Sequence, residues 1–92
     1  MQTNLDYPPL ATCLRQLDIA LADSGGNAIV QAERDIDAFA SHDSDLRRRA
    51  GHLHILHDEL DRKWKGLEGK RADFAFLVFE FIDKRMRELE RP

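Results

Sequence analysis

Apolar residues recur at alternating steps of three and four residues along the middle of the chain, from Ile29 to Leu67. A spacing that averages 3.5 residues keeps these positions on one side of an α-helix, as in a helical bundle or coiled coil. The twelve positions are Ile29, Ala32, Ile36, Phe39, Asp43, Leu46, Ala50, Leu53, His57, Leu60, Trp64 and Leu67, and ten of them are apolar. The pattern predicts an all-α fold: a small bundle of three or four antiparallel helices with coiled-coil-like packing.

Local start and stop signals divide the chain into an arm and four helices. The Pro8-Pro9 pair closes an extended arm over 1–8, Ser24-Gly25-Gly26 stops the first helix, and Asn27 is a suitable N-cap for the second. The predicted helices cover 9–23, 28–40, 45–65 and 71–90, all within a single domain over 9–92.

The segment 41–45 decides whether the second and third helices are separate. Its residues, Ser-His-Asp-Ser-Asp, favour caps and turns over helix interiors. The unbroken apolar spacing favours the alternative, one continuous rod of roughly 58 Å at 1.5 Å per residue. We expect the break, because four of these five residues are short and polar and carry a real helix-propensity cost.

The last predicted helix has more apolar residues than one core stripe needs. On a helical wheel the stripe comprises Phe74, Leu77, Val78, Phe81, Ile82, Met86 and Leu89. Phe76 and Phe79 project to the side of Asp83, and each carries roughly 1.5–3 kcal/mol of burial free energy. Either the arm, with Leu5 and Tyr7, folds over them or another chain buries them. Phe76, Phe79, Asp83 and Tyr7 are therefore the candidate interface residues.

Size and charge make association plausible. A chain of 92 residues holds one core of limited size, and its 42% hydrophobic and 34% charged residues are a globular balance. Residues 1–45 hold eight acids and two bases, net −6, whereas 46–92 hold nine acids and twelve bases, net +3. We expect acidic and basic helices to pack together, within one chain or between two. Nucleic acid is an unlikely partner, because acids are interspersed among the bases.

The remaining composition argues against catalysis and membranes. The single cysteine, Cys13, lies on the apolar face of the first helix and reads as a buried thiol. The longest dense apolar run, 74–79, is far shorter than a membrane span, and no signal peptide or phosphate-binding loop is recognisable. We expect a cytoplasmic, non-enzymatic protein without a cofactor and without a membrane partner.

The histidines suggest alternative functions to protein interaction. His54 and His57 each precede an aspartate by four residues, Asp58 and Asp61, a spacing that permits a weak metal site. His57 and Asp43 are also the two polar seam positions, where a polar residue sets register or oligomer state. A seam His57 without a carboxylate partner would weaken the fold on acidification.

The segment Asp45-Leu46-Arg47-Arg48-Arg49-Ala50-Gly51-His52-Leu53 resembles the stretch that leads into the phospho-accepting histidine of histidine phosphotransfer domains, which are also helical bundles. The resemblance covers nine residues and implies that His52 is the phospho-acceptor. The lysine that the family has three positions later is Ile55 here, and the following glycine is Leu56. Only His52 carries over.

The sequence therefore predicts a non-catalytic protein-interaction module, such as an adaptor, small chaperone or regulatory subunit, that self-associates as a homodimer or binds a protein partner. The alternatives are a phosphotransfer protein using His52 and a metal-binding bundle using His54 and His57.

Overall fold

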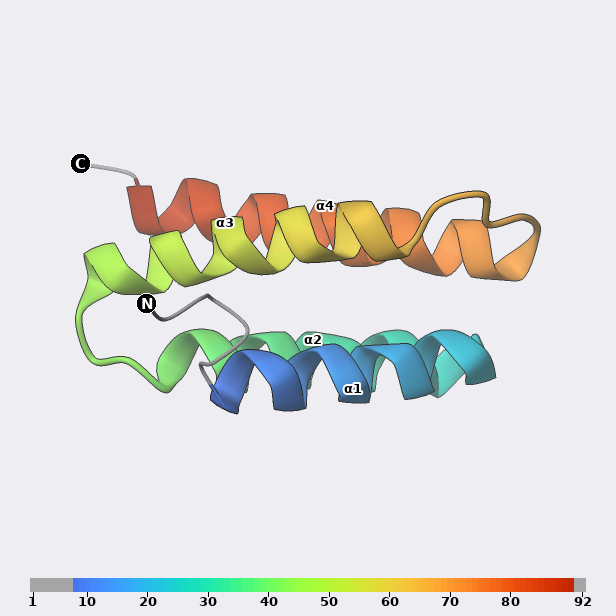
Figure 1. Ribbon diagram of the computed structural model, residues 1–92, viewed down its shortest axis with the longest axis horizontal. Coiled ribbons are helices and arrows are strands. Elements are labelled where there is room, and N and C mark those ends of the chain that lie inside the picture. Colours follow the sequence, from blue (N-terminus) through green and yellow to red (C-terminus); the bar gives the residue numbers. More distant parts are fainter. Residues whose placement is uncertain (1–7, 91–92) are drawn as a thin grey trace.

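The protein is a bundle of four α-helices joined by short connections (Figure 1). This computed structural model describes residues 8–90. Helix α1 spans Pro8–Asp23, α2 Gly26–Ser41, α3 Leu46–Lys63 and α4 Lys70–Glu90. No β-strand occurs over residues 8–90. The predicted all-α bundle is confirmed, and the helix bounds lie within two residues of the expected ones.

The helices form two layers of antiparallel pairs (Figure 1). Helices α1 and α2 lie side by side in one layer, and α3 and α4 in the other. Across the layers α1 is bonded to α3 through Asp18 and Lys63, and α2 to α4 through Asp37 and Arg85. Because the chain reverses at every connection, α2 and α4 run in the same direction.

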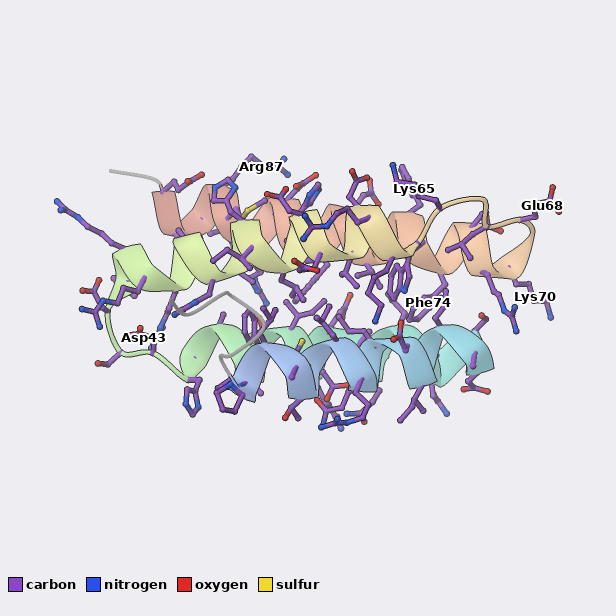
Figure 2. All side chains as sticks on the ribbon, in the orientation of Figure 1. Asp43, Lys65, Glu68, Lys70, Phe74 and Arg87 are labelled. Carbon is purple, nitrogen blue, oxygen red and sulfur yellow. The ribbon has the colours of Figure 1, made fainter. Side chains whose placement is uncertain are left out.

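The core lies between the two layers and takes residues from every helix. Its most completely buried large side chains are Leu10, Leu17, Ile36, Leu53, Leu56, Leu60, Val78 and Ile82. Figure 2 shows Phe74 pointing from α4 into the space between the layers, where its ring lies 6.1 Å from that of Trp64. None of the buried side chains within 8–90 is polar or charged. Apolar burial therefore holds the layers together.

The predicted break at 41–45 is confirmed, and two aspartates explain it. Asp43 Oδ1 accepts a hydrogen bond from the Asp45 amide at 2.9 Å, and Asp45 Oδ1 accepts one from the Arg47 amide at 2.9 Å. Asp45 is thus the N-cap of α3. Asp43 lies in the connection (Figure 2), so its expected place in a packed seam is wrong. The carboxylates satisfy backbone N–H groups that a continuous rod would have bonded internally.

We expect Asp45→Ala to lower the free energy of unfolding by about 1 kcal/mol, because it leaves the first amides of α3 without their acceptor. Urea unfolding followed by circular dichroism measures the change. Asp45→Ser keeps a capping oxygen and should recover most of the loss. Equal destabilisation by both substitutions would show that the cap contributes little.

Helix starts account for three smaller corrections. Pro8 belongs to α1 and not to the predicted arm. The rest of that arm, 1–7, lies outside the described residues. Gly25, not Asn27, occupies the N-cap of α2, without a side-chain cap bond. Leu46 was expected to point inward, but it is 57% exposed because it is the first residue of α3.

Helix α4 is rotated relative to the predicted stripe. Its buried residues are Phe74, Ala75, Val78, Ile82 and Met86. The centre of this stripe is shifted by about 40° from the predicted one, less than half of the 100° step between neighbours. Phe79 therefore packs against the core beside Trp64, and Leu77, expected inside, is 45% exposed. The expectation that Phe79 stands off the core stripe of α4 is wrong.

Candidate functional site

Large apolar side chains are exposed on α2 and α4. Within the described part of the chain, Val30 of α2 is 46% exposed, and Phe76 and Leu77 of α4 are 62% and 45% exposed. The two other exposed large apolar residues, Ile19 and Leu46, lie on α1 and at the start of α3. The surface of α2 and α4 is thus the most apolar candidate for contact with another molecule.

A groove of about 480 Å³ separates α2 from α4. Ile29, Leu77 and Phe81 are its apolar lining, and these three residues define what we call the α2–α4 groove. A neighbouring hollow shares Ile29 and Leu77 and continues to Lys70 and Asp73. Together the two hollows follow α4 from Lys70 to Arg87, with apolar lining residues in the middle and charged residues along their length.

The groove is closed at one end by an ion pair. Arg85 Nε donates to Asp37 Oδ1 at 2.9 Å, and its guanidinium lies 4.7 Å from the centre of the Phe81 ring. Hydrogen bonds to Asp37, and then to Glu88, raise the pKa of Arg85 above its ordinary value. This end of α2 is held to α4, whereas the end with Ile29 meets it mainly through apolar side chains.

The equivalent link between α1 and α3 is Asp18. Its carboxylate accepts from Lys63 Nζ at 2.6 Å and from Trp64 Nε1 at 3.0 Å. Partial burial raises the pKa of Asp18, but the hydrogen bonds from Lys63 and Trp64 outweigh it and leave the pKa lowered. Together with Asp37 and Arg85, this link confirms that acids of the first half pack against bases of the second.

Several charged residues beside the α2–α4 groove are unpaired within residues 8–90. Glu33, Lys70, Asp73, Lys84 and Arg87 form no ion pair with another described residue. Acids and bases lie in succession along an apolar lining, so the surface suits a partner with matching charges of both signs.

The predicted interface residues are dispersed. Phe76 is exposed, Phe79 packs against the core, and Asp83 Oδ1 lies 3.6 Å from His57 Nε2. Tyr7 lies outside the described residues. Leu77 was not predicted as a surface residue, because it fell on the wheel face assigned to the core. Leu77 lies four residues after Asp73 and seven before Lys84, and these helical spacings mark a second, outward stripe.

His57 was expected at a seam position, and the structure places two carboxylates beside its ring. Its Nδ1 lies 3.9 Å from Asp58 Oδ1, and Asp83 lies on its other side. The Phe79 ring packs edge-on against it at 4.9 Å between centroids. Its side chain is 31% exposed. The condition for weakening on acidification, a seam histidine without a carboxylate partner, is not met.

The residues of the metal alternative are not gathered into one site. His54 Nε2 lies 3.1 Å from Glu90 Oε2, not at the expected Asp58. His57 pairs with Asp58 and Asp83, not with Asp61. Over residues 8–90 no group of three or more His, Cys, Asp or Glu side chains is placed to hold a metal ion.

His52 is held against the α2–α3 connection. Its Nε2 lies 3.3 Å from Asp43 Oδ2, and its ring packs against Phe39 at 5.9 Å. The Asp45 amide, followed by His52 and Arg48, lowers the pKa of Asp43. The Asp43 carboxylate would repel a phosphoryl group on this nitrogen. This geometry disfavours the phosphotransfer alternative.

Among the described helices none is both long and apolar enough to cross a membrane.

Comparison with protein-family models, curated proteins and solved structures finds no match to this chain. The surface chemistry of the bundle therefore carries the functional proposal.

Proposed function

We propose that this chain is a cytoplasmic, non-catalytic protein-interaction module, of the adaptor, small chaperone or regulatory-subunit class, that self-associates as a homodimer. The observation that carries the proposal is a pair of adjacent exposed apolar residues on α4, Leu77, which lines the α2–α4 groove, and Phe76, which precedes it in the chain.

Burial energetics support association through this surface. Full burial of a large apolar side chain contributes roughly 1.5–3 kcal/mol, and about half of that is still available at Phe76 and Leu77. Aromatic residues are also enriched at protein interfaces and depleted from solvated surfaces. A second copy that covered the groove would remove the exposed part of Leu77 from water.

The monomer already has a complete core. Within 8–90 no buried side-chain nitrogen or oxygen lacks a hydrogen-bond partner, and every helix contributes fully buried residues. Folding therefore does not depend on the proposed contact, and disrupting the contact should leave a folded monomer.

Combined Phe76→Asp and Leu77→Asp substitution is expected to convert a reversible dimer into a monomer that keeps its helical circular dichroism. Two charges would replace the apolar contact, at a cost typical of interface hot spots. Sedimentation equilibrium at several protein concentrations measures the mass. Ile19→Asp, on the exposed face of α1, is the matched control and should leave the dimer intact. A wild-type protein that stays monomeric at high micromolar concentration, or a double variant that still dimerises, would refute self-association here.

A further inference from the structure

Charged and apolar residues follow one another along one side of α4 in an order that is complementary to the same order in the opposite direction. The row runs along the side of α4 next to the α2–α4 groove and comprises Lys70, Asp73, Leu77, Phe81, Lys84 and Glu88. Steps of three and four residues keep these positions on one side of the helix. Phe81 is half-buried, and the other five are exposed. We call this set the α4 row.

We propose that a second copy of this chain binds at the α4 row, with the two α4 helices antiparallel about a two-fold axis at the level of residue 79. The inference rests on the proposed self-association and specifies its geometry. In this register Leu77 faces Phe81 of the second copy, and Asp73 faces Lys84. Because the axis is two-fold, each contact occurs twice.

The charges select the antiparallel arrangement. Lys70 falls opposite Glu88 of the second copy, so both charged pairs of the row join residues of opposite charge. A parallel pair would place each residue opposite its own copy, with Asp73 against Asp73 and Lys84 against Lys84. Like charges at such distances repel and suppress the wrong pairing.

The charges also select the register. A slip of one helical turn in one direction brings Lys70 opposite Lys84, and a slip in the other direction leaves Asp73 opposite Leu89. Only the proposed register pairs Leu77 with Phe81 and both charges with their opposites. Lys70, Asp73 and Lys84 are available for this, because none has an ion-pair partner within 8–90.

The groove supplies the apolar part of the contact. Ile29 lines it beside Leu77, so the α4 helix of a second copy lying there would bury its own Leu77 against this lining. Solvent-exposed ion pairs contribute little affinity, so the apolar contact holds the dimer and the charges fix its register.

One feature opposes the arrangement and so provides a sensitive test. Glu80 lies one residue from the proposed axis, at the margin of the α4 row, and approaches its own copy there. Glu80→Gln removes this repulsion and should tighten the dimer severalfold.

Charge reversal tests the register directly. Asp73→Lys places lysine opposite Lys84 at two positions of the dimer, and Lys84→Asp places aspartate opposite Asp73 at two positions. Each single variant should dimerise about tenfold more weakly than wild type, the scale expected for two like-charge contacts. An equimolar mixture of the two variants should form a heterodimer of near wild-type affinity, because both contacts are then of opposite sign. Sedimentation equilibrium measures the affinities, and native mass spectrometry distinguishes the heterodimer.

Matched variants locate the contact. Asp61→Lys and Lys65→Asp make the same charge changes on or just after α3 and should leave the dissociation constant unchanged. Leu77→Asp should give a monomer, whereas Phe76→Asp, about 100° around the helix and outside the α4 row, should retain most of the dimerisation. Circular dichroism checks that each variant is folded.

The outcomes separate the two proposals. A wild-type dimer whose charge-reversed variants behave like wild type, or form no preferred heterodimer, overturns the α4 register while self-association stands. A dimer lost through Phe76→Asp alone, with Leu77→Asp unaffected, also overturns it and moves the contact to the other side of α4. A wild-type monomer at high micromolar concentration overturns both.

Discussion

Leu53→Ala is expected to lower the free energy of unfolding by about 3 kcal/mol, a large part of the stability of a domain of this size. Leu53 is fully buried in α3, in the core between the two layers. The truncation removes apolar burial and leaves a cavity, because the packed helices on both sides relax only in part. The melting temperature should fall by roughly 12–24 °C.

Urea unfolding at one fixed protein concentration measures this loss, since dimerisation makes apparent stability depend on concentration. Leu46→Ala is the matched control: it makes the same change in the same helix, at an exposed position. It should change stability by less than about 0.5 kcal/mol. Similar losses for Leu46→Ala and Leu53→Ala would contradict the burial of one face of α3 in the core.

The thiol of Cys13 is expected to react about a thousandfold more slowly in the folded protein than in the unfolded chain at pH 8. Burial, reinforced by the nearby Asp35 carboxylate, raises the pKa of Cys13 from 9.0 to about 12. Its Sγ also points to the Asp35 carbonyl oxygen at 3.8 Å. Because the thiolate is the reactive form, a pKa of about 12 in place of 9.0 leaves about a thousandfold less of the reactive species.

Labelling with a thiol reagent, with and without denaturant, measures the two rates. A folded protein that reacts nearly as fast as the denatured one would contradict the burial of Cys13. The raised pKa also predicts a pH effect on stability. Above pH 9 the unfolded thiol loses its proton first, so the free energy of unfolding should fall as the pH rises from 9 to 12. Cys13→Ala should show a smaller decline over that range.

Local signals predicted the helices and their ends closely. The segment 41–45 illustrates why. Asp43 and Asp45 each accept a hydrogen bond from an amide two residues later, so the sequence of this short segment is enough to predict the break. The same holds for the connection at Ser24-Gly25. These features depend on short-range backbone chemistry and not on how the helices meet.

The candidate surface was predicted only in part. Phe76 lies off the core stripe as predicted, but Phe79 and Leu77 exchanged their expected places because α4 is rotated by about 40°. When a helix has extra apolar residues on both sides of its core stripe, several rotations of the helix about its own axis would bury an apolar face. Packing of Phe79 beside Trp64 and His57 selected one of them.

By itself the sequence determined an all-α chain, four helices, the break at 41–45, a buried Cys13 and the acid-to-base attraction between its two halves. Those properties follow from spacing along one helix, from capping residues and from composition. Only the tertiary structure decided which acid meets which base, that His52 lies against Asp43 and His57 beside Asp83, and that Leu77 faces a groove next to Ile29. Such contacts join residues of different helices or connections, most of them far apart in the chain. They depend on the rotation and height of each helix against its neighbours, which a one-dimensional apolar pattern leaves open.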